Sequence, residues 1–457
     1  MNIQDNKTKK VHFISLGCPK NLVDSEIMAG TLMKDGYAVV AEAEEADTVV
    51  VNTCGFIEDS KKESIQKILD MASLKEEGKI KKIVVAGCLT QRYKTDLVEG
   101  LPEADLFVGS GEFQNIGQIL KNHEQGEKKK TFFNLPTYLQ EESTPRVNSQ
   151  PQHRAYLKIS EGCMKRCAFC AIPLIRGNLQ SRKLENIVNE AKLLAASGVK
   201  EIIIISHDFT DYGLDLKRKD PSALEPPVEL LRRLAEVEGL KWIRLLYLYP
   251  DGITPEMIQL IKSNDKFVKY FDMPLQHISN SVLKSMNRKM TREEIVMALN
   301  LIRTEIPEAV IRTQFIVGFP GETQQDFEEL LQFIAEQKFD RVGCFQYSPE
   351  ENTPGGKMDQ QVDDNIKQAR HDAVMEVQQN ISREKHKDFI GKTVEVVVEG
   401  LSDETDLLLQ GRTSQQAPDI DGVVLINDGQ AKIGEFVKVK ITDSMEYDLI
   451  GEIIESV

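Results

Sequence analysis

Three cysteines stand close together near the middle of the chain, in the run Gly162 to Cys170. Cys163, Cys167 and Cys170 are separated by three and then two residues, so one short loop can deliver three thiolates to three corners of an iron–sulfur cubane. Soft thiolates select iron–sulfur clusters or zinc, but a zinc site normally needs four protein ligands, and no fourth Cys or suitably spaced His lies nearby. A ferredoxin-like electron carrier would space its ligands by two residues throughout. The pattern therefore favours a 4Fe-4S cluster with one iron left open.

A second set of cysteines is spread over the first ninety residues. Cys18, Cys54 and Cys88 are 36 and 34 residues apart, and each lies just beyond a predicted strand. Loops that follow neighbouring strands of a parallel sheet converge at one edge, so these three thiolates can meet there. Each is flanked by a glycine, which lets the backbone approach a bulky cluster closely. The alternative is three unrelated core cysteines, which is how we interpret the remaining Cys344.

The elements that position the second set are short apolar strands, each followed by a helical pattern. We predict strands over 11–16, 48–52 and 82–86. This alternation is typical of a βαβ domain with a parallel sheet, which we assign to residues 1–123. Residues 124–152 are rich in Gly, Lys, Gln, Ser and Pro and are predicted to be a linker.

The elements that position the first set begin after the linker. Six further strands separated by helical stretches are predicted over 155–159, 201–205, 242–247, 270–273, 310–317 and 342–347. Six consecutive βα units indicate a partial barrel of the TIM kind over residues 153–382, with its chemistry at the C-terminal ends of the strands. The run that ends at Cys170 follows the first of these strands.

The last segment, residues 383–457, alternates apolar and polar residues with a period of two. Strands are predicted over 393–398, 423–426 and 436–441, with glycines at the turns. This pattern predicts a small all-β barrel. The fold class is therefore α/β with a C-terminal all-β barrel.

Length, composition and net charge indicate what kind of protein this is. The chain has 457 residues, 41% of them hydrophobic and 28% charged, which is typical of a soluble globular protein with several domains. Its start is polar and it contains no long apolar run, so we expect a cytoplasmic protein without a membrane partner. Seven cysteines, an odd number, favour thiolate ligands over disulfides. The formal net charge of −15 suits a basic partner better than nucleic acid.

The first cysteine run resembles the signature of the radical S-adenosylmethionine (SAM) enzymes, including the aromatic Phe169 before the last ligand. The resemblance implies that SAM binds the open iron through its amino and carboxylate groups. It also implies that an electron from the cluster cleaves SAM to a 5′-deoxyadenosyl radical, which abstracts hydrogen from carbon.

With the second cysteine set, the resemblance covers the whole chain and is to the methylthiotransferases. These combine an N-terminal cluster domain, a radical-SAM barrel and a C-terminal TRAM domain. The resemblance implies two 4Fe-4S clusters, exogenous sulfur on the auxiliary cluster, SAM as both methyl donor and radical source, and an electron donor. The rival class, a non-catalytic two-cluster electron carrier, would have no use for a barrel or an open iron.

The chain could belong to either of two branches of this family, which act on different substrates. One modifies an adenosine in tRNA, and the other an aspartate β-carbon of the twelfth small-subunit ribosomal protein. The stretches Ser15 to Glu26, Asp272 to His277 and Gly411 to Thr413 resemble the ribosomal-protein branch. Residues 383–457 contain 8 Lys and Arg against 16 Asp and Glu, a formal charge of −8, which suits a basic protein and opposes RNA. The alternative is that this acidity is merely a solvated surface.

The resemblance also suggests residues near the cofactor. Gly318 and Glu322, in the run Gly-Phe-Pro-Gly-Glu, resemble the family stretch beside SAM; alternatively, these glycines only turn the chain into the next helix. Arg176 is predicted to reach the SAM carboxylate or the substrate aspartate, with a solvated surface position as the alternative. His207 departs from the family pattern and receives no role. The sequence leaves open whether Lys158 and Arg312 face the site.

Overall fold

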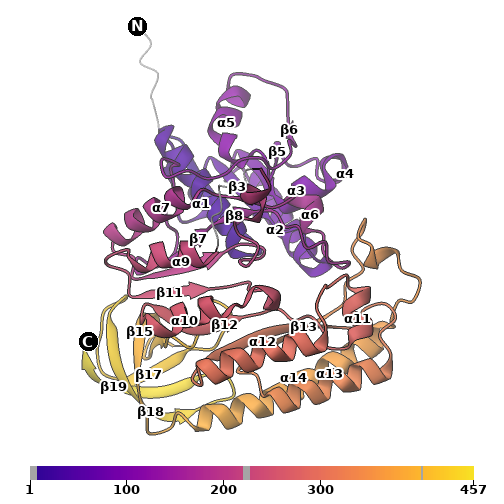
Figure 1. Cartoon of the computed structure of the whole chain (residues 1–457). Coiled ribbons are helices and arrows are strands. Elements are labelled where there is room, and N and C mark those ends of the chain that lie inside the picture. Colours follow the sequence, from indigo (N-terminus) through magenta and orange to yellow (C-terminus); the bar gives the residue numbers. More distant parts are fainter. Residues whose placement is uncertain (1–7, 220–226, 403–404, 457) are drawn as a thin grey trace. The chain divides into compact units, whose positions relative to one another are not determined.

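The structure is a computed structural model that describes residues 8–219, 227–402 and 405–456 (Figure 1). Contacts between residues divide the chain into two compact units. The first unit contains residues 8–149, 158–166 and 170–187, and the second contains 150–157, 167–169 and the rest of the described chain from 188. The predicted domain limits at 123, 152 and 382 stay predictions.

The first unit is built on a parallel six-stranded sheet with the strand order β2-β1-β3-β4-β5-β6. Its strands are β1 (Lys10–Ser15), β2 (Ala38–Val39), β3 (Thr48–Thr53), β4 (Lys82–Gly87), β5 (Leu106–Gly109) and β6 (Thr131–Phe132). The three predicted strands are confirmed as β1, β3 and β4, which are neighbours in the sheet. The strands that the sequence did not predict are two to four residues long, and β6 lies inside the predicted linker. A small antiparallel ribbon joins β8 (Ser160–Glu161) to β9 (Gln180–Ser181).

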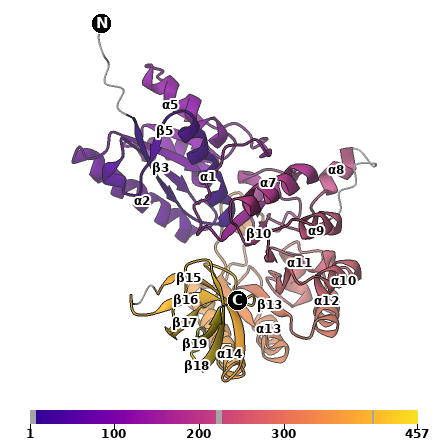
Figure 2. The ribbon, with the colours of Figure 1, turned by 90° about the vertical axis from the view of Figure 1, so that its left-hand side faces the viewer.

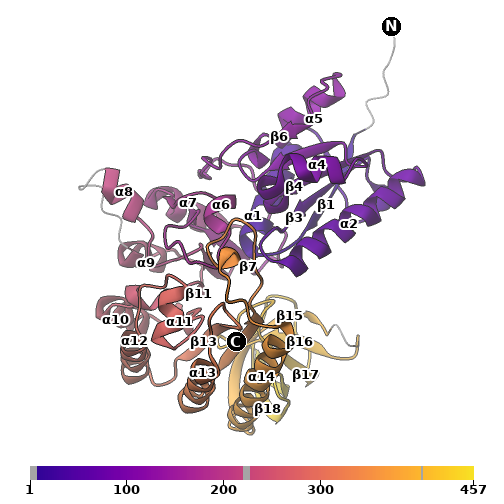
Figure 3. The ribbon, with the colours of Figure 1, turned by 90° about the vertical axis from the view of Figure 1, so that its right-hand side faces the viewer.

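Helices cover this sheet because the strands are apolar on both faces. They are α1 (Pro19–Lys34), α2 (Glu58–Glu76), α3 (Cys88–Tyr93), α4 (Thr95–Gly100), α5 (Ile116–Glu124) and α6 (Ile172–Ile175), with the short η1 (Ala43–Glu45) and η2 (Phe113–Asn115). Ile68 and Met71 of α2 pack with Val49, Val51 and Val85 of the sheet. Figure 3 shows α2 beside the strands.

The second unit contains a six-stranded sheet with the order β14-β13-β12-β11-β10-β7. The strands are β7 (Arg154–Lys158), β10 (Glu201–Ile205), β11 (Trp242–Leu245), β12 (Phe267–Asp272), β13 (Val310–Val317) and β14 (Arg341–Gln346). From β10 to β14 each neighbouring pair is parallel. The prediction of six strands in a partial barrel is confirmed, with most strand ends shifted by a few residues.

The helices of this unit alternate with its strands. They are α8 (Leu214–Lys219), α9 (Pro227–Ala235), α10 (Pro255–Ser263), α11 (Asn280–Ser285), α12 (Arg292–Glu305), α13 (Gln324–Gln337) and α14 (Asp364–Lys387), with η3 (Pro250–Gly252) and η4 (Gly355–Lys357), while α7 (Leu184–Ala196) passes from the first unit to the second. Side-chain caps mark the starts of two of these helices: Thr254 caps α10, and Thr291 forms a capping box with Glu294 on α12. Figure 2 shows α10 beside α12, which it contacts.

The C-terminal segment forms a closed barrel with the order β15-β16-β17-β19-β18. Its strands are β15 (Thr393–Leu401), β16 (Leu409–Arg412), β17 (Val424–Asp428), β18 (Phe436–Ser444) and β19 (Leu449–Ser456). Alternate valines such as Val396, Val398, Val437 and Val439 fill its interior, as the period of two requires. The predicted all-β barrel is confirmed, although β16 and β19 were not predicted. Helix α14 contacts β18 (Figure 3).

Candidate functional site

The three N-terminal cysteines lie at the carboxyl edge of the first sheet. Cys18 precedes the first residue of α1, Cys54 follows the end of β3, and Cys88 opens α3 directly after β4. Because β1, β3 and β4 are adjacent parallel strands, their following loops start side by side. The structure thus places the three cysteine-bearing loops at one edge of the sheet, and their joint binding of a cluster stays a prediction.

Two glycines allow the chain to fold this tightly around the cysteines. Gly17 has φ +86°, and a Cβ there would stand 2.7 Å from the Cβ of Cys54. Gly87 has φ +95°, and its Cβ would stand 2.2 Å from Oδ1 of Asn52. Both positions therefore require glycine for conformation and for space.

The thiols are close enough to influence one another. Burial raises the pKa of Cys88 to about 12; Arg176 opposes this rise, and Cys18 and Cys54 add to it. Burial also raises the pKa of Cys54, with a further contribution from Cys18. Thiolates are the soft ligands that iron–sulfur clusters take, so the chemistry of this donor set fits such a cluster. Within 8–219, 227–402 and 405–456, no three His, Cys, Asp or Glu side chains are grouped so as to hold one metal ion.

The charged side chain of Arg176 contacts Cys88 of this set. Its guanidinium is 1% exposed, and its Nε and one terminal nitrogen lie 3.3 and 3.1 Å from Sγ of Cys88. The other terminal nitrogen donates to Asp24 at 2.6 Å, and Asn21 accepts a further bond at 3.1 Å. The sequence predicted Arg176 near SAM or substrate, and that role stays a prediction. Its contact with Cys88 was not foreseen, since 88 residues separate the two.

Buried ion pairs hold Arg176 in place. Lys158, left open by the sequence, is buried and bonds Asp24 and Glu161. Glu161 also lies 3.4 Å from the Arg176 guanidinium. Burial opposes the charge on Arg176, but Asp24, Cys88 and Glu161 together hold its pKa well above the ordinary value. Arg176 is therefore a fixed cation beside Cys88.

Backbone conformation and backbone hydrogen bonds shape the loop that carries the first cysteine run. Gly162 (φ +69°) and Arg166 (φ +56°) take left-handed conformations, and a Cβ on Gly162 would stand 2.2 Å from the carbonyl oxygen of Asn178. The Cys163 amide donates to Gly177, and the Lys165 amide points at Sγ of Cys163 at 3.5 Å. Cys163 and Cys170 belong to the first unit and Cys167 to the second. The three thiols are partly exposed.

A second arginine, which the sequence did not reveal, faces Cys167. A terminal nitrogen of Arg288 lies 3.9 Å from Sγ of Cys167, and the other donates to the Pro274 carbonyl at 2.8 Å. The guanidinium also lies over the ring of Tyr249, 4.3 Å from its centre. The sequence could not reveal the contact between Arg288 and Cys167, because the two residues come from distant segments of the chain.

The Gly318 to Glu322 stretch forms a tight loop after β13. The Glu322 carboxylate accepts from the amides of Gly318 and Phe319 at 2.6 and 3.1 Å and pairs with Arg370 at 2.9 Å. Burial raises the pKa of Glu322 to about 7, against the lowering effect of Arg370 and the two amides. The carboxylate thus shapes the loop. Phe169 packs in the same apolar group as Phe319. Contact of these residues with SAM stays a prediction.

Some acidic side chains of the C-terminal barrel bond to other residues of the second unit. Glu399 bonds Arg154 and Arg412 at 3.2 and 2.9 Å, and Asp421 accepts from Tyr270 at 2.7 Å. These two carboxylates are therefore already paired within the second unit, so not all of the formal charge of −8 counted for residues 383–457 is available to a partner. Arg312, whose orientation the sequence left open, pairs with Asp272 of β12 at 2.7 Å.

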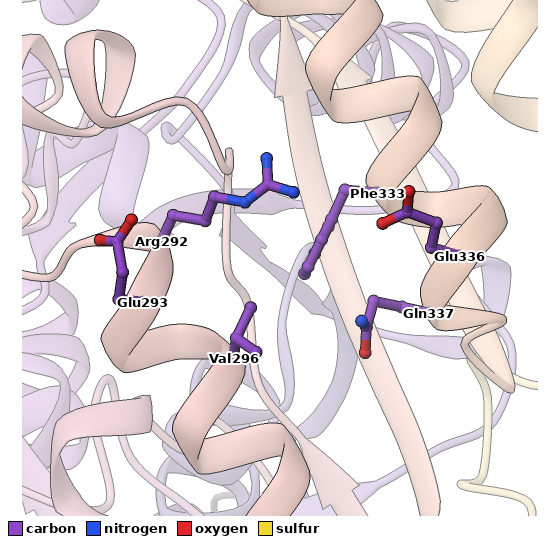
Figure 4. Close-up of a pocket in the computed structure, with 6 residues that line it drawn as sticks. All are labelled: Arg292, Glu293, Val296, Phe333, Glu336 and Gln337. Atoms are coloured by element: carbon purple, nitrogen blue, oxygen red, sulfur yellow. The ribbon is translucent and has the colours of Figure 1, made fainter.

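A surface hollow of about 390 Å³ lies elsewhere, between α12 and α13 (Figure 4). Its lining residues are Arg292, Glu293, Val296, Phe333, Glu336 and Gln337. Arg292 pairs with Glu329 at 2.5 Å and lies 5.8 Å from the centre of the Phe333 ring. None of the predicted site residues lines this hollow, so it is separate from the predicted site.

Comparisons with solved structures show the fold. One similar structure is the radical S-adenosylmethionine methyltransferase TsrM from Kitasatospora setae, with a TM-score of 0.53, 15% identity and coverage of 76% of this chain and 75% of that chain. Another is the cobalamin-dependent S-adenosylmethionine radical enzyme OxsB, with a TM-score of 0.52, 15% identity and coverage of 83% and 56%. At this identity the likeness supports the architecture alone.

Family models match three segments in order. They are the uncharacterized protein family UPF0004 over residues 10–109, the Radical SAM superfamily over 157–334 and the TRAM domain over 390–454. The Radical SAM match means that the chain is an enzyme that uses an iron–sulfur cluster and SAM. None of the helices in the described ranges is long and apolar enough to span a bilayer.

Curated relatives match over nearly the whole chain. A protein of Bdellovibrio bacteriovorus named ribosomal protein uS12 methylthiotransferase RimO is 78% identical over 454 residues, which cover 99% of each chain. Proteins of the same name from Trichlorobacter lovleyi and Geobacter sulfurreducens are each 48% identical and cover 98% of this chain and 98% and 99% of their own lengths. The chain therefore belongs to the RimO family of radical SAM methylthiotransferases.

Proposed function

We propose that this chain adds a methylthio group to the β-carbon of an aspartate of ribosomal protein uS12. The observation that carries the proposal is the 78% identity, over 99% of both chains, to a protein named for this activity. The converging N-terminal thiols support it, because sulfur insertion needs a second group that can carry sulfur. The tRNA alternative is not favoured, since the relatives named above are uS12 enzymes.

Cys163, Cys167 and Cys170 are the proposed ligands of the SAM-binding 4Fe-4S cluster. With SAM bound, this cluster supplies the radical that abstracts hydrogen, and a further SAM supplies the methyl group. The chain's own contribution is the tight loop from Gly162, the apolar packing around Phe169 and the backbone of the Gly318 loop. These parts would position the cofactor.

Cys18, Cys54 and Cys88 are the proposed ligands of a second 4Fe-4S cluster, with exogenous sulfur on its open iron. Three thiols at the edge of one sheet, with Gly17 and Gly87 packed behind them, leave one iron of a cubane without a protein ligand. A reduced electron donor completes the proposed set of partners.

The substrate test is intact-mass analysis of uS12 after anaerobic incubation with the reconstituted enzyme, SAM, sulfide and reductant. A gain of one CH₂S unit on an aspartate is expected, and the gain should disappear when SAM is omitted. An unchanged uS12 together with methylthiolated tRNA in a parallel reaction would overturn the choice of substrate.

Iron analysis tests the two ligand sets separately. The reconstituted chain should hold about eight irons. Replacing Cys163, Cys167 and Cys170 by Ala should leave about four, and so should replacing Cys18, Cys54 and Cys88. The matched control is Cys344→Ala, a core cysteine of β14, which should retain all of the iron.

A further inference from the structure

The feature behind this inference is the pair of contacts between Arg176 and Cys88. We propose that Arg176 is a positioning residue that donates two N–H···S hydrogen bonds to Cys88 and thereby raises the reduction potential of the auxiliary cluster. The inference rests on the proposed function, because it requires Cys88 to be a cluster ligand.

The geometry of the guanidinium matches this role. Its Nε and one terminal nitrogen form one edge of the planar fork, and both lie within 3.3 Å of the same sulfur. The other terminal nitrogen is taken by Asp24, at 2.6 Å. A planar fork fixed on one side presents its remaining donors in a set direction, which a lysine ammonium cannot do.

The surroundings of Cys88 strengthen the interaction. Ala171 and Ile175 pack against the Cys88 side chain, and Arg176 itself is 1% exposed. A hydrogen bond and a positive charge both act more strongly where water is excluded. Reduction adds one electron to a cluster, so a fixed cation and N–H donors at a ligand sulfur stabilise the reduced form more than the oxidised form.

A purely structural role is the competing explanation, because Arg176 also pairs with Asp24 and Glu161. Such a role would affect the free energy of unfolding and the iron content, but not the potential of a cluster that is present. A matched control is available in Arg182, which is also 1% exposed and donates to the carbonyl oxygens of Gln140 and Lys158 at 2.8 and 2.6 Å.

The experiment uses the full chain with Cys163, Cys167 and Cys170 replaced by Ala, so that only the auxiliary cluster contributes to the spectrum. After reconstitution with iron and sulfide, a redox titration followed by electron paramagnetic resonance measures the reduced fraction at each potential. R176M should lower the ratio of reduced to oxidised cluster about tenfold at a fixed potential, a shift of about 59 mV for one electron. R176K keeps the charge but not the fork and should shift the ratio in the same direction by less. R182M should leave the ratio unchanged.

The outcomes separate the two proposals. The parent is the chain in which Cys163, Cys167 and Cys170 are replaced by Ala. If this parent does not bind about four irons after reconstitution, both the auxiliary cluster and this role of Arg176 are wrong. If the parent holds its irons and the potentials of R176M and R176K equal that of the parent, only the role of Arg176 is wrong. If R176M fails to fold, R176K decides by the same comparison. An equal shift in R182M would also overturn the assignment to the sulfur contact.

Discussion

Asn21 is the residue that joins the cysteine loops to their supporting strands. Its amide nitrogen donates to the carbonyls of Leu16 and Asn52 at 2.8 and 3.2 Å, after β1 and in β3. Its oxygen accepts from Arg176 at 3.1 Å. This explains part of the stretch from Ser15 to Glu26, which the sequence marked as a family motif: its polar side chains hold the loop behind Cys18.

Replacing Asn21 by Ala should therefore weaken the auxiliary site. Buried carbonyls lose their donor, which costs about 1–3 kcal/mol of the free energy of unfolding. Denaturant unfolding and iron analysis, in the background that keeps only the auxiliary cluster, measure the two effects. The control is Asn427→Ala at an exposed position of β17. Equal behaviour of the two variants would contradict the role given to Asn21.

Glu399 predicts how stability depends on pH. Burial opposes its ionisation, but His153, Arg412 and Arg154 hold its pKa well below the ordinary value. A carboxyl with a lowered folded pKa stabilises the protein above its unfolded pKa, and this stabilisation is lost as the pH falls toward the folded pKa. As the pH falls below about 5, Glu399→Gln should thus flatten the fall of the melting temperature. The exposed Glu455→Gln should not, and parallel profiles for the parent and Glu399→Gln would contradict the prediction.

At the scale of elements, the site depends on where β4 stops and α3 starts. Gly87 is the last residue of β4, and Cys88 is the first residue of α3. The turn between strand and helix is thus a single residue, made possible by φ +95° at Gly87. This close junction keeps Cys88 at the sheet edge near the other two cysteines.

Gly87→Ala should disrupt this junction more than an ordinary glycine replacement. Gly36 also has a positive φ, of +90°, but its Cβ would meet nothing within 4 Å, so Gly36→Ala measures backbone strain alone, about 1–3 kcal/mol. Gly87→Ala adds the clash with Asn52 and should cost more free energy of unfolding and lower the iron bound at the auxiliary site. Equal losses in the two variants would show that the clash is relieved without cost.

At the scale of the whole molecule, the net charge of −15 should draw a basic substrate to the enzyme. The C-terminal barrel contributes exposed carboxylates such as Asp406, Asp428 and Asp443, whereas Glu399 and Asp421 are engaged inside the second unit. Docking through this barrel remains a prediction.

The measurement is kcat/KM for uS12 as a function of ionic strength. It should fall as salt is raised, because screening reduces the association rate. Neutralising Asp406, Asp428 and Asp443 to amides should lower kcat/KM at low salt and flatten its salt dependence. Neutralising Glu58, Asp59 and Glu63, which are exposed on α2, is the control. Equal effects of the two triple variants would mean that the charge acts without a preferred docking surface.

The sequence by itself determined the alternating strands and helices and the cysteines at the strand ends. These are local patterns: a buried strand is a short apolar run, and parallel strands repeat at regular intervals. The two-residue strands β2 and β6 were missed because so short a segment has no period of its own.

Only the tertiary structure decided which side chains meet. Arg176 with Cys88, Arg288 with Cys167 and Arg412 with Glu201 join segments 88, 121 and 211 residues apart. A charged residue in a sequence does not reveal whether it faces water or a buried partner, since that depends on how distant elements pack. For the same reason the sequence supplied the total charge of the C-terminal barrel, whereas the structure decided which carboxylates are turned inward.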